Sequence, residues 1–121
     1  MQKKEIAPNI IHYMFPPKVG GSGFFGTVTV ALVSENRALL VDAGYEGDGC
    51  QIKDDLAKQG IVVEKIVLSH FHDDHMEGAK AFPDAKIYGS RRFQETLDLW
   101  TPKEEHKFYT PAVAIEKPFM L

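Results

Sequence analysis

The sequence predicts an α/β fold built on a mixed β-sheet with helices packed against it. Short apolar runs of strand length alternate with helical patterns between residues 38 and 100, as expected for parallel strands joined by right-handed helical crossovers. Ahead of this region, residues 27–34 and 38–44 are apolar or β-branched runs separated by three polar residues, which predicts an antiparallel hairpin. The chain has 121 residues, so we treat residues 1–121 as a single unit.

The first half of the chain contains further strand and helix signals. Residues 10–15 predict a strand that ends at two prolines, and a glycine-rich loop is expected at residues 20–26. Asp48 and Gln51 have the spacing of a capping box, so a helix is expected to begin at Asp48. Gly60 provides the left-handed residue that ends it.

The second half continues the alternation. Residues 62–69 predict a strand whose apolar centre, residues 66–68, is buried on both faces. A short helix at 76–82 and a strand at 86–90 follow. Ser90 is expected to cap a last helix, whose apolar residues at i, i+4 and i+7 are predicted to join the core: Phe93, Leu97 and Trp100.

Composition and charge exclude several classes of protein. The formal net charge of −3 argues against nucleic-acid binding, which needs a surplus of basic residues. Cys50 is the single cysteine, so no disulfide forms within the chain. The charged start of the sequence contains no apolar run of the kind found in a signal peptide or membrane anchor. We therefore expect a cytoplasmic protein that does not associate with membranes.

The segment SHFHDDHMEG, residues 69–78, contains three of the five histidines within six positions. It follows a predicted strand, and ligands of open α/β sheets bind beyond the carboxyl ends of strands. In an extended chain His70 and His72 project to the same side and can hold one ion. Asp74 and His75 follow at the turn and can hold a second ion nearby.

Each of these residues also has a simple structural explanation. A lone histidine is usually a surface or hydrogen-bonded core residue, and Asp73 and Asp74 suit the start of a helix. As a set they are harder to explain, since three neighbouring imidazoles repel one another when protonated and need partners when buried. We interpret the segment as a metal site. The glycine-rich segment GSGFFG, residues 21–26, precedes a strand and therefore does not fit a dinucleotide-binding loop.

The segment from His70 to His75 resembles the H-x-H-x-D-H signature of the metallo-β-lactamase superfamily, and Gly78 lies where a glycine normally follows. Residues 39–44, LLVDAG, are similar to the family's strand that ends in Asp-x-Gly. This resemblance implies half of a four-layer αββα sandwich, a mixed sheet with helices on one face. It assigns His70 and His72 to a first metal and Asp74 and His75 to a second. Asp42 would orient ligands by hydrogen bonds from behind.

The resemblance also implies a function. The ions would be zinc, two per complete site, with iron or manganese as alternatives. A metal-bound hydroxide, oriented by Asp74, would attack an ester, thioester, lactone, amide or phosphodiester in a small-molecule substrate. Two other functions remain open: a non-catalytic metal-binding or assembly fragment, and an iron-dependent redox protein.

The resemblance implies further ligands in a second half of the sandwich, and we expect this chain to lack that half. The one later histidine, His106, lies in a charged segment that we interpret as a solvated loop. A half-sandwich leaves one apolar sheet face bare, so we expect a complementing second half or a homo-oligomer.

Overall fold

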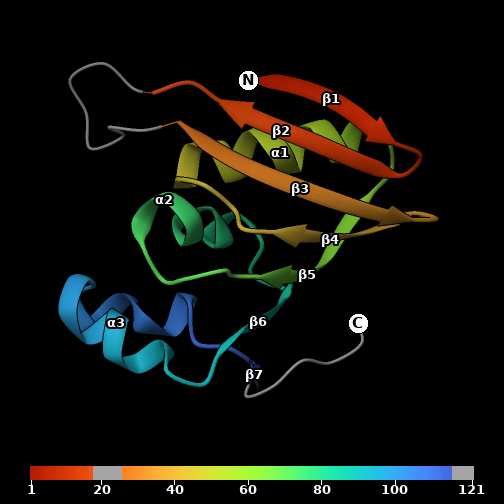
Figure 1. Ribbon diagram of the computed structural model, residues 1–121. Coiled ribbons are helices and arrows are strands. Elements are labelled where there is room, and N and C mark those ends of the chain that lie inside the picture. The colour runs from red at the N-terminus through yellow and green to blue at the C-terminus, as the bar shows by residue number, and fades with distance from the viewer. Residues whose placement is uncertain (18–25, 116–121) are drawn as a thin grey trace.

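The computed structural model describes residues 1–17 and 26–115, which form one seven-stranded sheet with its strands in chain order (Figure 1). The expected glycine-rich loop falls almost entirely outside these residues. The described elements are β1 (Gln2–Ala7), β2 (Ile10–Phe15), β3 (Thr27–Ser34), β4 (Arg37–Val41), α1 (Glu46–Lys58), β5 (Val62–Val67), α2 (Asp73–Met76), the 3₁₀ helix η1 (Glu77–Ala81), β6 (Lys86–Ser90), α3 (Phe93–Trp100), the 3₁₀ helix η2 (Lys103–Phe108) and β7 (Val113–Ile115).

The sheet is mixed, which confirms the predicted fold class. Strands β1 to β4 pair antiparallel, and the hairpin between β3 and β4 turns at Glu35, which has a left-handed φ of 57°. Strands β4 to β7 pair parallel, with a helical segment in each connection between them. Because parallel strands end at the same edge, the segments that follow β4 and β5 meet there.

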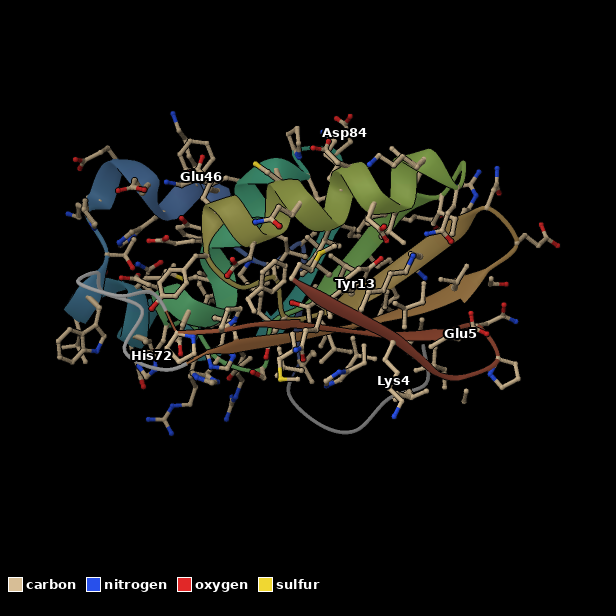
Figure 2. The ribbon with its side chains drawn as sticks, turned by 90° about the horizontal axis from the view of Figure 1, so that it is seen from above. Lys4, Glu5, Tyr13, Glu46, His72 and Asp84 are labelled. Atoms are coloured by element: carbon tan, nitrogen blue, oxygen red, sulfur yellow. The ribbon has the colours of Figure 1, made fainter. Side chains whose placement is uncertain are left out.

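The core lies between one face of the sheet and α1. Alternate residues of β3 point into it, so Thr29 and Ala31 are fully buried. Ile52 and Leu56 are four residues apart on α1 and are also fully buried. Each such aliphatic side chain contributes roughly 1.5–3 kcal/mol to folding. Figure 2 shows α1 along this face of the sheet.

The opposite face of the sheet carries exposed apolar side chains in the described residues, together with polar ones such as Lys4 and His12. Met14 and Val28 are paired across β2 and β3, and their exposed fractions are 40% and 45%. Leu32 lies further along β3 and is 39% exposed. No helix within residues 1–17 and 26–115 is long and apolar enough to cross a membrane.

Several sequence expectations need correction. The first long helix begins at Glu46 instead of Asp48. Asp48 is its third residue, and the Asp48 carboxylate caps the start of the helix by accepting a hydrogen bond from the Tyr45 backbone N–H at 3.0 Å. Trp100 is 68% exposed, so only Leu97 of the last helix is fully buried. The expected helix at 76–82 is the 3₁₀ segment η1, and α2 begins earlier, at Asp73.

Helix α1 and η1 approach each other so closely that only glycine fits at the contact. A Cβ atom on Gly78 would lie 1.9 Å from the Ala43 carbonyl oxygen, and one on Gly49 would lie 2.5 Å from the Gly78 carbonyl oxygen. These neighbours are backbone atoms, which cannot rotate away as a side chain can. Gly47, also in α1, has no atom within 4 Å of its Cβ position.

We expect Gly78→Ala to lower the free energy of unfolding by about 3 kcal/mol, because the methyl group forces the backbones apart. Gly47→Ala is the matched control and should be neutral or stabilising by up to about 1 kcal/mol, since alanine favours helix. Urea denaturation of both variants measures the difference. Equal stability of the two variants would show that the close contact is not a constraint.

A second prediction concerns Tyr13, whose hydroxyl donates to the Asp55 carboxylate at 2.7 Å and joins the sheet to α1 (Figure 2). Burial, then the hydrogen bond and charge of Asp55, raise the pKa of Tyr13 above its ordinary value. A raised pKa stabilises the fold at pH values below about 10, and this contribution is lost as pH rises further. Urea denaturation at about pH 8 and pH 11 should therefore show a smaller loss of stability in Tyr13→Phe than in the parent. An equal loss in both proteins would contradict this assignment.

Candidate metal centre

The histidine-rich segment lies where the parallel strands β4 and β5 end. The backbone N–H of Asp42, just after β4, donates to the Val67 carbonyl at the end of β5 at 2.8 Å. The next N–H, of Ala43, donates to the His75 carbonyl at 2.8 Å, and Gly78 N–H donates to the Gly44 carbonyl at 2.8 Å. These bonds fix the segment that carries the histidines against the turn that follows β4.

Asp42 occupies the centre of this arrangement. Its φ of 63° lies in the left-handed region, where aspartate is more common than most other non-glycine residues, and it is 7% exposed. Its carboxylate accepts the Ser69 backbone N–H at 2.7 Å through Oδ1 and the Ser69 hydroxyl at 2.7 Å through Oδ2. His75 Nδ1 also lies 2.8 Å from Oδ2. One buried carboxylate therefore holds both ends of the motif.

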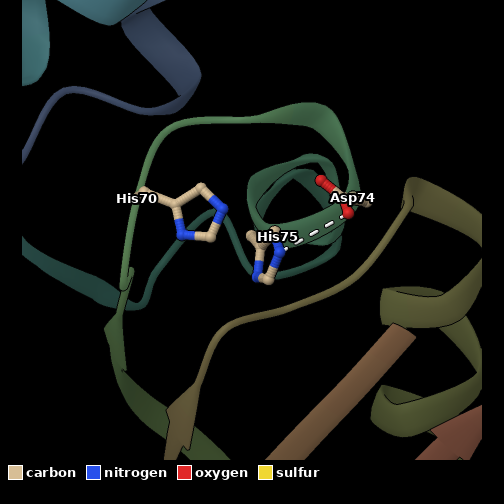
Figure 3. A group of neighbouring side chains, drawn as sticks. All are labelled: His70, Asp74 and His75. Carbon is tan, nitrogen blue, oxygen red and sulfur yellow. Dashed lines mark ion pairs between the residues drawn. The ribbon is translucent and has the colours of Figure 1, made fainter. Parts of the chain in front are cut away.

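Three of the predicted ligands converge at this edge (Figure 3). The ligand atoms of His70, Asp74 and His75 all lie within 4.8 Å of one another, and we call these residues the ligand group. His75 Nε2 and an Asp74 carboxylate oxygen are 3.5 Å apart. His70 comes from the loop after β5, whereas Asp74 and His75 come from the single turn of α2.

The ligand group combines residues that the sequence analysis assigned to two different ions. His72 lies outside the group, as the residue that precedes α2, with its ring centroid 4.9 Å from that of His70. The assignment of all four residues as metal ligands therefore stays a prediction. Figure 2 shows His72 at the edge of the molecule.

The geometry and charge of the ligand group suit a metal ion. Zinc bonds nitrogen at about 2.0–2.1 Å in a tetrahedral arrangement, so two ligand atoms of one ion are about 3.4 Å apart. A group that spans 4.8 Å needs only a small side-chain movement to close around such an ion. Two imidazoles and a carboxylate, without a thiolate, are a common donor set for zinc.

Electrostatics also favour the neutral form of His70. Burial lowers the pKa of its imidazole, and the neighbouring His75 and His72 rings lower it further against the opposing effect of Asp42 and Asp74. The centroids of the His70 and His75 rings are only 3.9 Å apart. A metal ion requires neutral imidazole, so this environment favours the form that binds.

His106 and Ser69 lie differently with respect to the ligand group. His106 lies in η2 away from the ligand group, where Nε2 donates to the Thr101 carbonyl at 2.9 Å and Nδ1 accepts from the Gln94 amide at 3.1 Å. Ser69 received no role in the sequence analysis, although it contacts both Asp42 and His70. The only sign of this role in the sequence is its position directly before His70.

The chain resembles known proteins in family and in sequence. Residues 22–119 match the family described as the metallo-beta-lactamase superfamily. The hydroxyacylglutathione hydrolase of Aeromonas salmonicida (strain A449) is 38% identical over 61 residues, which are 47% of this chain and 23% of that protein. The hydroxyacylglutathione hydrolase of Pectobacterium carotovorum subsp. carotovorum (strain PC1) is 33% identical over a stretch with the same shares.

Solved structures show the same fold at low sequence identity. The metallo-beta-lactamase from Erythrobacter litoralis has a TM-score of 0.73 at 19% identity and covers 94% of this chain and 49% of its own. The mono-zinc form of the metallo-beta-lactamase FIM-1 from Pseudomonas aeruginosa has a TM-score of 0.75 at 13% identity, covering 95% and 50%.

The chain thus spans about half the length of these solved structures and about a quarter of the curated relatives that it matches. The family match extends over most of the chain and agrees with the fold that these structures share. The resemblance seen in the sequence is confirmed, and this chain belongs to the metallo-beta-lactamase superfamily.

Proposed function

We propose that this chain is the part of a metal-dependent hydrolase that provides the first set of ligands to a zinc site. The observation that carries the proposal is the convergence of His70, Asp74 and His75 within 4.8 Å at the carboxyl ends of parallel strands. Membership of the metallo-beta-lactamase superfamily supports it. So does the mono-zinc form in which one protein of the same fold was solved.

Each residue of the site would have a separate role in metal binding or in catalysis. When bound, zinc supplies Lewis-acid activation of water and of the scissile group. The imidazoles of His70 and His75 would bind the ion through nitrogen. Asp42 contacts the His75 ring directly, and it contacts the His70 ring through the Ser69 hydroxyl. His72, which lies beside His70, would join when the site is complete. The Asp74 carboxylate would provide one oxygen as a ligand and would accept a hydrogen bond from the attacking water with the other, which would orient that water.

Thioesters are the substrate class we favour within the broader set of esters, lactones, amides and phosphodiesters. Two relatives that are more than 30% identical across 47% of this chain are named hydroxyacylglutathione hydrolases, and a hydroxyacylglutathione is a thioester. The aligned stretch is a small share of those proteins, so the likeness supports a class of bond and leaves the rest of the substrate open.

The rest of the site would come from outside the described residues. The solved structures of this fold are about twice as long as this chain, and exposed apolar side chains lie on one face of its sheet, with Met14 40% and Val28 45% exposed. We propose that a second half of the sandwich covers this face and provides the remaining ligands. Pairing of two copies of the chain is the alternative that the mass in solution would reveal.

Metal binding provides the first test of the proposed function. The full chain should bind zinc, and His70→Ala or Asp74→Asn should weaken binding by more than the roughly 10–100-fold typical of an outer hydrogen-bond partner. His12→Ala is the matched control, because His12 lies in the middle of β2 and should leave zinc affinity unchanged. Competition with a chromophoric chelator measures all four proteins. Equal affinity of parent and His70→Ala would refute the site.

Turnover provides the second test. With zinc added, the chain together with its complementing half should hydrolyse a thioester, and activity should disappear on chelation and return when zinc is restored. Asp74→Asn should lose most of the rate even at saturating zinc, since the attacking water loses its acceptor. Zinc binding without turnover of any ester, thioester or phosphodiester would instead favour a non-catalytic metal-binding role. Bound iron with oxygen uptake would favour redox chemistry.

A further inference from the structure

Ser69 lies between a buried carboxylate and a predicted metal ligand. Its backbone N–H and its hydroxyl both lie 2.7 Å from the Asp42 carboxylate, one on each oxygen. The same hydroxyl oxygen is 3.0 Å from Nδ1 of His70. The hydroxyl therefore has two hydrogen-bond partners, and only one proton to share between them.

The number of protons decides the direction of each bond. A carboxylate has only acceptors, so the Ser69 hydroxyl must donate its proton to Asp42. Its oxygen then has no proton for His70, and His70 Nδ1 must carry the proton and donate to Ser69. The reverse arrangement would place lone pairs of Ser69 and Asp42 against each other at 2.7 Å and would lose a charge-assisted hydrogen bond.

The same reasoning applies to His75. Its Nδ1 lies 2.8 Å from Oδ2 of Asp42, so that nitrogen also carries a proton and donates. Both rings therefore keep the lone pair on Nε2. One carboxylate sets the tautomer of His75 directly and that of His70 through the hydroxyl of Ser69.

We propose that Ser69 is a positioning residue whose hydroxyl fixes His70 as the Nδ1–H tautomer and thereby presents Nε2 of His70 to the metal ion. The part of the proposal that concerns metal rests on the proposed function. The tautomer itself is a property of the metal-free chain and is tested without any ion.

The direct test is nitrogen NMR of the imidazole rings in the metal-free full chain at about pH 8, where neutral imidazole dominates. In the parent, Nδ1 of His70 should give the shift of a protonated nitrogen and Nε2 that of an unprotonated one. Ser69→Ala removes the acceptor, so His70 should move toward the Nε2–H tautomer. Ser69→Thr keeps the hydroxyl and should retain the parent tautomer.

Two controls separate positioning from a general loss of structure. His75 keeps its bond to Asp42 in every Ser69 variant, so its tautomer should not change. Ser34→Ala alters an exposed serine at the end of β3 and should leave both rings unchanged. An unchanged His70 tautomer in folded Ser69→Ala, or the same change in Ser69→Thr as in Ser69→Ala, would overturn the proposal.

Zinc affinity provides the second readout. Ser69→Ala should bind zinc about 10-fold more weakly than the parent, and Ser69→Thr should restore affinity to within about twofold. Parent and Ser69→Ala with equal affinity would overturn the role of Ser69 toward the metal. A parent that binds no zinc but shows the expected tautomers would instead refute the proposed function, so the two failures are distinguishable.

Discussion

The carboxylate of Asp42 is the constraint on which the rest of the site depends. It lies at a left-handed residue directly after β4 and accepts hydrogen bonds from Ser69, which precedes the motif, and from His75, which is its last residue. A loop with two aspartates and three histidines would otherwise be free to spread into solvent, because each of these side chains is well hydrated alone. One buried acceptor makes a single arrangement of the loop more stable than the others.

Backbone packing supports this arrangement from the other side. The Gly78 contact with Ala43 brings η1 against the turn that contains Asp42, and Gly49 allows α1 to approach at the same point. The core side chains of α1 then fix that contact to the sheet. The position of the ligand group is thus determined by β4, β5 and α1 together, at the edge where parallel strands end, and the zinc chemistry proposed for it requires this shared position.

Periodicity predicted most of the sheet, because β3 and most of β4 are apolar or β-branched runs with turn residues between them. It missed β1, whose charged residues are held in the sheet by pairing with β2 and by the ion pair between Lys3 and Asp55 at 2.9 Å. Trp100 was misplaced because helical spacing identifies a face and does not reveal whether a partner covers it. The motif located the candidate site, whereas the contacts of Ser69 depend on a left-handed turn after β4 that the sequence pattern does not specify.

The zinc chemistry proposed for this protein requires that side chains from residues 70 to 75 hold a divalent ion at the edge of the sheet. Anomalous diffraction at the zinc absorption edge, from crystals of the zinc-saturated chain, tests it most directly. We expect an anomalous peak within bonding distance of Nε2 of His70, Nε2 of His75 and a carboxylate oxygen of Asp74. A saturated crystal without a peak among these atoms, with the side chains directed into solvent, would contradict it.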